Sequence, residues 1–233
     1  MSRGYPRTNA EAANALHAYV VTDRPPLRWL HQHRCPHTNA RAAREYVGRV
    51  AVEVKLYREL DPEEIEEWKR LATKAHPPGE VRLASDLSWA ELDPGTDYLL
   101  RAREGSDLRA CAWVTKRTVT ISDREIRVAG IRGVVTDPDH RRRGFGRAVM
   151  ERAHELMCSF EDCDIALLFS SVMAVPFYES LGWRAIRRAV TCEQPAGRID
   201  YTAALPAAPV MAFALRPSAR LPAGDVHVHG LPW

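Results

Sequence analysis

The chain has 233 residues, of which 45% are hydrophobic and 27% are charged, and this composition is typical of a globular protein. It excludes collagen-like, coiled-coil and wholly disordered classes, and with no run of about 18 uncharged apolar residues no membrane-spanning helix is expected. The net charge of +3 is too small to indicate nucleic-acid binding by itself.

The first 48 residues differ in character from the rest of the chain. They hold seven arginines and no lysine against three acidic residues, which gives +4, and four prolines interrupt any periodicity. We expect a basic, poorly ordered extension over residues 1–48, followed by one domain over residues 49–233. The extension lacks the interleaved aromatic residues of a base-stacking surface, so no nucleic-acid partner is expected.

Histidine and cysteine residues give no metal signature. The run His31-Gln-His33-Arg-Cys35-Pro-His37 contains ligand types, but it lacks the second pair of ligands that structural zinc sites use. The five cysteines are scattered, and no pair has Cys-x-x-Cys spacing. We therefore expect no metal, and we interpret the cysteines as reduced thiols of a cytoplasmic protein.

The domain begins with a predicted strand and helix. Alternating valines predict a strand over Arg49–Tyr57. Asp61-Pro62-Glu63-Glu64 begins a helix, because Asp61 can cap free N–H groups and proline suits the first helical position. His76-Pro77-Pro78-Gly79 ends this helix, and a loop or short helix leads to Asp93-Pro94-Gly95.

Three strands joined by short turns are predicted next. They span Tyr98–Arg103, Leu108–Val119 and Glu125–Thr136, and the short turns predict antiparallel neighbours. Gly130 and Gly133 weaken the third strand. Glycine inside a strand marks a bulge or a close approach by a ligand or another part of the chain, so we expect one or the other here.

From residue 137 onwards the pattern becomes that of a βαβ unit. A turn over Asp137–His140 precedes helical periodicity over Arg141–Phe160, and a short apolar strand, Ile165–Phe169, follows. Strand, helix and strand in this order predict a right-handed crossover with a parallel pair. The remaining predicted elements are a short helix over Val175–Leu181 closed by Gly182, strands over Trp183–Cys192 and Pro209–Leu215, and an irregular tail.

The start of the long helix predicts an anion-binding site. Arg141, Arg142 and Arg143 precede Gly144 and Gly146 at this helix N-terminus. Unpaired N–H groups and the positive end of the helix dipole attract an anion, especially a pyrophosphate. Glycine lets the anion approach the backbone, and arginine adds charge-assisted donors. The segment is neither a Walker loop nor a dinucleotide-binding fingerprint.

These motifs resemble those of the GNAT N-acetyltransferase family. Arg141-x-x-Gly144-x-Gly146, after Val134-Val135-Thr136-Asp137-Pro138, looks like the family's acyl-CoA-binding motif. Phe177-Tyr178-Glu179-Ser180-Leu181-Gly182-Trp183 has the form of a second family motif. The resemblance covers about residues 50–216. It implies a mixed α/β fold, in which helices flank a twisted sheet of about six or seven strands with splayed central strands.

The resemblance also implies a reaction and its site residues. An acetyl group would pass from acetyl-CoA to an amine of a small molecule by direct attack in a ternary complex. The Val135 N–H would stabilise the oxyanion, and Tyr178 would protonate the departing thiolate. The implied acetyl-CoA-binding residues are Val134, Val135, Thr136, Arg141, Arg142, Arg143, Gly144, Phe145 and Gly146. By residue type alone, base candidates for the acceptor amine are Glu80, Asp86, Glu91, Asp225 and His227.

Within the family, the chain is similar to the aminoglycoside 2′-N-acetyltransferases. The similarity runs from Ile131-Arg132-Gly133-Val134-Val135 to a tail Ala223-Gly224-Asp225-Val226 with a closing tryptophan, and it implies Arg132, Gly133, Asp86 and Asp225 as acceptor-binding residues. Those enzymes have a glutamate where this chain has Arg132. An arginine disfavours a polycation, since two charges about 5 Å apart repel by ~3 kcal/mol at an effective dielectric of 20. An acceptor with a carboxylate or phosphate beside its amine suits Arg132 better.

Two other function classes compete with this interpretation. One is a non-catalytic acyl-CoA-binding sensor module. The presence of Tyr178 at the position of the family's general acid argues against it. The other is nucleic-acid binding through the basic extension. The sequence identifies neither the acceptor nor the oligomeric state, and it leaves a homodimer open.

Overall fold

The computed structural model describes residues 50–76, 89–206 and 208–233. The predicted extension over residues 1–48, with its histidine and cysteine run, lies outside the described residues, as do Glu80 and Asp86.

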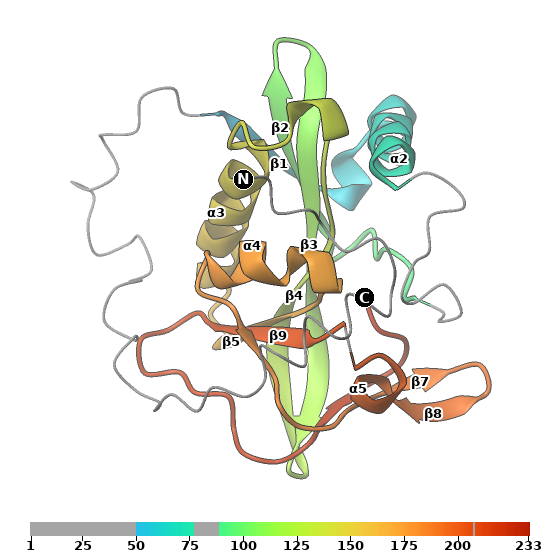
Figure 1. The fold of residues 1–233 in the computed structure, drawn as a ribbon, viewed down its shortest axis with the longest axis vertical. Coiled ribbons are helices and arrows are strands. Elements are labelled where there is room, and N and C mark those ends of the chain that lie inside the picture. The colour runs from blue at the N-terminus through green and yellow to red at the C-terminus, as the bar shows by residue number, and fades with distance from the viewer. Residues whose placement is uncertain (1–49, 77–88, 207) are drawn as a thin grey trace, which may run out of the picture.

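A long antiparallel hairpin forms the centre of the molecule (Figure 1). Its strands are β3 (Asp107–Ile121) and β4 (Arg124–Thr136), joined by a tight turn. Ser122 and Asp123 make this turn with positive φ angles of 47° and 63°. These two strands match the second and third predicted strands: β3 begins one residue earlier and ends two residues later than predicted, and β4 begins one residue earlier.

Strands add to both edges of the hairpin and complete a mixed sheet. Beyond β4 lie β5 (Ile165–Phe169), which is parallel to it, and then β9 (Val210–Ala214) and β6 (Arg184–Ala185). The other edge of β3 pairs with two strands in tandem, β2 (Tyr98–Glu104) and β10 (Val226–Val228). Beyond these, β1 (Val52–Leu56) pairs with β2, β7 (Val190–Gln194) pairs with β10, and β8 (Gly197–Asp200) pairs with β7.

Within the described residues the sheet has ten strands, which corrects the expected six or seven. The predicted strand over Trp183–Cys192 is two strands, because the chain leaves β6 at one end of the sheet and joins β7 near the other. The predicted irregular tail contains β10, whose alternating side chains are buried by pairing with β3 and β7. The mixed α/β class with flanking helices is confirmed.

Helices cover the two faces of the sheet, with α2 on one side and α3 and α4 on the other (Figure 1). The helix α2 (Pro62–Ala75) begins as predicted, since the Asp61 side chain accepts a hydrogen bond from the Glu64 N–H at 2.8 Å. The other elements are α3 (Phe145–Cys158), α4 (Val175–Glu179), α5 (Tyr201–Ala204) and the short 3-10 helices η3 (Tyr57–Glu59), η4 (Pro138–His140) and η5 (Val172–Ala174).

Side-chain alternation along β3 assigns its residues to the two sides of the sheet. Ala112 and Val114 belong to the hydrophobic core beneath α3, whereas Cys111 and Trp113 belong to the core beneath α2. Trp113 is fully buried, and its ring meets those of Tyr57 and Trp68 edge-on at 5.5 and 5.3 Å. Hydrophobic cores therefore cover both faces of β3 and β4, and a third cluster packs against Val119, Ile121 and Val128 at the other end of the hairpin.

The cysteines only partly follow the prediction. Cys111, Cys163 and Cys192 are free and buried. Cys158 takes part in a disulfide, so the expectation that all five are reduced thiols is wrong at that position.

Candidate functional site

A β-bulge interrupts the pairing of β3 and β4 at Gly133. Cys111 is opposite Val135 and Trp113 is opposite Arg132, so one extra residue is inserted on β4. Gly133 has a φ of +56°, a left-handed conformation that favours glycine. The predicted bulge is therefore confirmed at Gly133.

The bulge coincides with the point at which β4 and β5 separate. Their parallel pairing ends at Ile131 and Leu168, although β4 continues through Arg132–Thr136. Among the described strands this last stretch pairs with β3 alone. Val134 packs toward the core beneath α3 and Val135 toward the core beneath α2. Backbone groups on the β5 side of Val134–Thr136 can therefore pair with a ligand between the strands.

The segment after β4, residues 141–146, is the predicted anion-binding segment, and we call it the cradle. Gly144 is the N-cap of α3 with a φ of +90°, and no side chain caps the helix there. The first N–H groups of a helix have no partner within it, so they are available to an anion. Gly146 lies tightly against the end of β4, since a Cβ on it would stand 2.7 Å from Thr136 Oγ1. Phe145 is buried beneath this loop and anchors it in the core.

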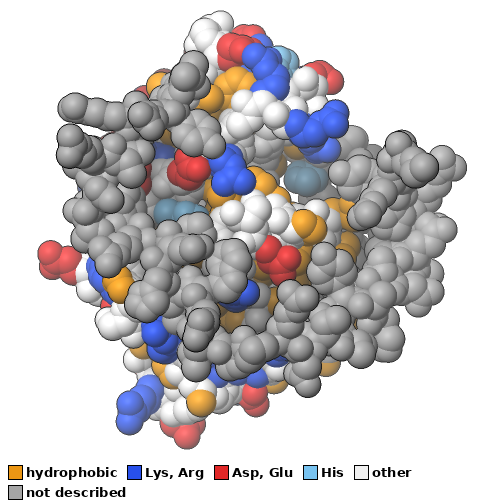
Figure 2. All heavy atoms as spheres, turned by 60° about the vertical axis from the view of Figure 1, so that its left-hand side comes forward, with side chains coloured by type: hydrophobic (Ala, Val, Ile, Leu, Met, Phe, Trp, Pro, Cys, Tyr) orange, Lys and Arg blue, Asp and Glu red, His pale blue; other side chains and the backbone are white. Residues whose placement is uncertain are grey.

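The three arginines before the helix differ in their contacts. Arg141 and Arg142 are exposed, and neither forms an ion pair with a residue of the described chain. Arg143 pairs with Glu104, and its guanidinium lies 5.4 Å from the centre of the Phe145 ring. Figure 2 shows blue and red side chains close together at the top of this face, so its described part carries both charges.

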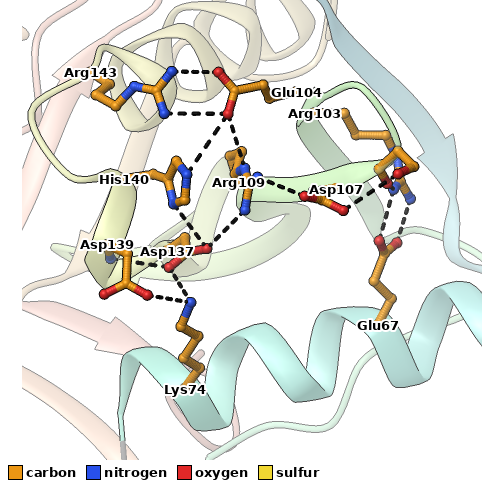
Figure 3. A network of polar contacts seen from close by, with 11 residues as sticks. Glu67, Lys74, Arg103, Glu104, Asp107, Arg109, Asp137, Asp139, His140 and Arg143 are labelled. Carbon is orange, nitrogen blue, oxygen red and sulfur yellow. Dashed lines mark hydrogen bonds and ion pairs between the residues drawn. The ribbon is translucent and has the colours of Figure 1, made fainter.

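A polar network supports the cradle from below (Figure 3). Its centre is the buried carboxylate of Asp137, which is 2.6 Å from Lys74 Nζ of α2 and 3.3 Å from Arg109 of β3. The carboxylate also accepts a hydrogen bond from the Asp139 N–H at 3.1 Å. Burial by itself would raise the pKa of Asp137, but Lys74, the Asp139 N–H and the nearby His140 hold it below its usual value. The network fixes η4, and with it the path of the chain into α3.

Tyr178 lies on α4, on the side of the sheet that α3 covers. It is buried, with 7% of its surface exposed, and its ring is 5.3 Å from Phe177 and 6.4 Å from Trp183. The loop after α4 turns at Gly182, whose φ of +91° confirms the predicted left-handed position. Burial raises the pKa of Tyr178 above its ordinary value, so the hydroxyl keeps its proton at neutral pH.

The implied acceptor-binding residues do not all come together. Arg132 and Gly133 lie at the bulge, and Arg132 donates to the Glu91 carbonyl at 3.2 Å. Asp225 is exposed next to β10, beside Ile121. Ile121 is eight residues beyond Trp113 along β3, about 27 Å from the bulge at the usual strand rise. Asp86 lies outside the described residues.

The base candidates are likewise dispersed. Glu91 is beside Arg132, whereas His227 lies on β10, where its Nδ1 is 2.9 Å from Thr191 Oγ1 and its Nε2 is 3.5 Å from Glu193. Glu80 is outside the described residues, and Asp225 is at the far end of β3. The described residues therefore leave Glu91 as the one base candidate near the bulge.

Sequence reasoning missed the side chain that covers Gly130. A Cβ on this glycine would lie 2.4 Å from the indole Nε1 of Trp233 and 2.8 Å from Thr115 Cγ2. The predicted close approach at Gly130 is therefore made by a side chain of the same chain, 103 residues away in sequence. Trp233 is 2% exposed and also contacts Phe169 and Arg117.

Within the described ranges, no group of three or more His, Cys, Asp or Glu side chains could hold a metal ion. No helix of the described chain is long and apolar enough to cross a membrane.

Comparison with known proteins identifies the family to which the chain is similar. A family model described as an acetyltransferase (GNAT) domain matches residues 56–186, more than half of the chain. None of the curated proteins matches the sequence. Among solved structures, Escherichia coli ElaA is similar with a TM-score of 0.50 and 15% identity, over 70% of this chain and 97% of that one. An acyl-CoA N-acyltransferase from Pseudomonas aeruginosa has a TM-score of 0.49 and 17% identity, over 70% and 99% of the two chains.

Proposed function

This chain belongs to the acetyltransferase (GNAT) family, and from that premise we propose that it transfers the acetyl group of acetyl-CoA to an amine of a small molecule. Family membership makes it an N-acetyltransferase with an acyl-CoA co-substrate. We propose further that the acyl group is acetyl and that the acceptor is a small molecule. We also propose direct attack in a ternary complex, with roles for individual residues.

The separation of β4 from β5, directly before the uncapped N-terminus of α3, is the observation that carries the proposal. A pantetheine arm needs amide partners and space between strands, and Val134–Thr136 offer backbone groups without a β5 partner. A pyrophosphate needs N–H donors and positive charge, and the cradle at Gly144–Gly146 offers both, with Arg141 and Arg142 nearby.

The reaction requires three tasks of the chain. The amine nitrogen attacks the thioester carbonyl, a C–N bond forms, and the C–S bond breaks after the negative charge has passed through the carbonyl oxygen. The Val135 N–H donates to that oxygen. Tyr178 gives its proton to the departing sulfur, and its raised pKa keeps that proton available at neutral pH.

The acceptor amine must lose a proton before or during attack. Glu91 lies near the bulge through its backbone contact with Arg132, and it is the described carboxylate that we propose for this task. His227 and Asp225 are excluded as bases by their distance along β3.

Aminoglycosides form a second candidate class of acceptor, because of the sequence similarity described above. Arg132 argues against them, since its guanidinium remains charged and stands at the bulge where the acceptor would approach. We therefore favour an acceptor other than a polycation. A non-catalytic acyl-CoA sensor would share the cradle, but it would have no need of Tyr178 on α4.

The proposed activity is tested by following CoA release from acetyl-CoA with a panel of amines. Release should require both protein and amine, and the Tyr178→Phe variant should retain acetyl-CoA binding while losing most of the rate. Binding of acetyl-CoA without release for any amine would favour the sensor module. Release at the wild-type rate by Tyr178→Phe would contradict the proposed role of the hydroxyl.

A further inference from the structure

Two arginines lie on the α2 side of the sheet, on either side of Trp233. Trp113, Thr115 and Arg117 alternate along β3 and therefore share one face. Arg132 is opposite Trp113, and Gly130 is opposite Thr115. Since Trp233 covers the pair of Thr115 and Gly130, it separates Arg132 on the side of the bulge from Arg117 on the other side.

The other buried or half-buried arginines of β2 and β3 have carboxylate partners. Arg101 pairs with Glu53 and Glu64, Arg103 pairs with Glu67, and Arg109 pairs with Asp107 and Asp137. This part of the sheet thus compensates its arginine charges within the chain, as partly buried charges require.

Arg117 and Arg132 break that rule. In the described chain neither forms an ion pair with a carboxylate. Arg132 donates to a backbone carbonyl, and the Arg117 guanidinium lies 5.8 Å from the centre of the Trp233 ring. Burial lowers the pKa of Arg132, Asp97 raises it and Arg117 lowers it further. The Asp97 carboxylate accepts a hydrogen bond from the Asp93 N–H at 2.9 Å.

The same face holds buried donors that lack acceptors. Arg117 Nε, Trp113 Nε1 and Trp233 Nε1 are all buried without a hydrogen-bond partner. A buried donor without an acceptor is costly, and such groups are rare in folded proteins. Two arginines without a paired carboxylate, one of them with an unpartnered Nε, complement a ligand that is negatively charged and rich in lone pairs.

This face is adjacent to the proposed site of acetyl transfer. Arg132 precedes Val135 by three residues on β4, which corresponds to at most about 10 Å along the strand. One small molecule can therefore place an amine near Val135 and a second group near the Arg132 guanidinium, if a few bonds separate them.

We infer that the acceptor is an amine that also carries a carboxylate or a phosphate, that Arg132 binds this anionic group, and that Arg117 on the other side of Trp233 adds positive charge. The inference rests on the proposed acetyltransferase function and names its substrate class. A planar guanidinium fork suits both anions, and the charges repel cationic competitors.

Matched acceptors test the inference. We would compare kcat/KM for glycine, 4-aminobutyrate and 6-aminohexanoate with the values for their methyl esters, for aminoalkyl phosphonates of similar length, and for diamines. The wild type should prefer at least one anionic amine over its uncharged partner by about tenfold to a hundredfold, as expected for hydrogen bonds to a charged group. Comparing kcat/KM for the amino carboxylates with kcat/KM for the aminoalkyl phosphonates then shows which anion is preferred.

Variants assign the preference to the two arginines. Arg132→Gln should abolish the ratio by which kcat/KM for the anionic amine exceeds kcat/KM for its ester, and Arg117→Gln should reduce this ratio. Arg127→Gln is the matched control, because Arg127 is on β4 but 44% exposed and paired with Asp162. It should retain the full preference. Calorimetry with acetyl-CoA should give unchanged affinity for all three variants.

Inorganic phosphate gives a measurement that needs no variant. Phosphate bound at Arg132 should inhibit the wild type competitively against an ester amine, whereas phosphate in the cradle would compete with acetyl-CoA. Acetylation of amines without any preference for the anionic partner, or with a preference for diamines, would overturn the inference and leave the proposed function intact. Failure to bind acetyl-CoA would overturn both.

Discussion

Trp233 and Gly130 form a contact that only glycine permits: the indole Nε1 lies 2.4 Å from the place where a Cβ on Gly130 would stand. The end of the chain is thereby packed against β4, two residues before Arg132 and three before the bulge at Gly133. Any side chain at Gly130 must move the indole, and with it the surface between the two arginines.

Gly130→Ala should therefore destabilise the fold and impair the acceptor side of the site. Overpacking of this kind costs about 1–3 kcal/mol, which denaturant unfolding would detect. In the double variant with Trp233→Ala, part of this loss should disappear, because the nearer clashing side chain is gone and Thr115 Cγ2 remains. Gly95→Ala is the control, since its Cβ would meet only the Asp93 carboxylate at 3.3 Å. The predicted contact would be contradicted if Gly130→Ala and Gly95→Ala lost equal unfolding free energy, or if the losses from Gly130→Ala and Trp233→Ala were additive in the double variant.

The arginines of the cradle should contribute unequally to acetyl-CoA binding. Arg142→Gln should raise the Kd by about threefold to tenfold, because an exposed, unpaired guanidinium can turn to the pyrophosphate. Arg143→Gln should raise it less, since Arg143 is held by Glu104. Both effects should shrink with added salt. Calorimetric titrations at two ionic strengths would measure this, and equal Kd values for the two variants would refute the distinction.

Tyr178→Phe should lower kcat by a factor of about 10² to 10⁴, the usual contribution of a general acid, with little change in acetyl-CoA affinity. Because burial raises the pKa of Tyr178, its proton is lost only at high pH. The acid-dependent part of the wild-type kcat should therefore not fall with pH up to about 10, the pKa of an ordinary phenol. A decline in kcat near pH 8 that Tyr178→Phe removes would contradict this assignment.

Asp137→Asn should reduce stability in a way that depends on pH. The pKa of Asp137 is lowered in the folded state, so its contribution is present above the unfolded value of about 3.9 and is lost as the pH falls through the folded value. At pH 7 the variant should lose about 1–3 kcal/mol of unfolding free energy.

The difference between wild type and Asp137→Asn should narrow as the pH falls below about 4. Asp139→Asn is the matched control, because Asp139 contacts the same Lys74 but its side chain is 72% exposed, and it should change stability by less than about 1 kcal/mol. If the difference in unfolding free energy between wild type and Asp137→Asn did not change with pH, the Asp137 contacts would not stabilise the fold through their charge.

The bulge and the glycine-containing start of α3 could be predicted from local residue types, whereas the separation of the central strands was implied by the family resemblance. Glycine at positions 133 and 144 is required by backbone conformations that few other residues adopt, and the strand-to-helix order follows from hydrophobic period. The family resemblance joined these local features into one site.

The acceptor side could not be predicted in the same way. The short strand β10 and the packing of Trp233 on Gly130 depend on contacts across more than 100 residues, which leave no periodic signal. Arg117 carried no motif, and its position opposite Val128 follows only from the register of the hairpin. Asp225 was singled out by the resemblance in the tail, but pairing of the next residue, Val226, with Ile121 places it far from the bulge.

The central claim is that the chain binds acetyl-CoA through the segment between β4 and α3. Calorimetric titration of acetyl-CoA into the wild type and into a folded Arg142→Glu/Gly144→Glu variant tests it most directly. We expect micromolar, stoichiometric binding by the wild type and none by the variant, because two carboxylates would occupy the cradle and repel the pyrophosphate. No binding by a folded wild type, or equal binding by the variant, would contradict the claim.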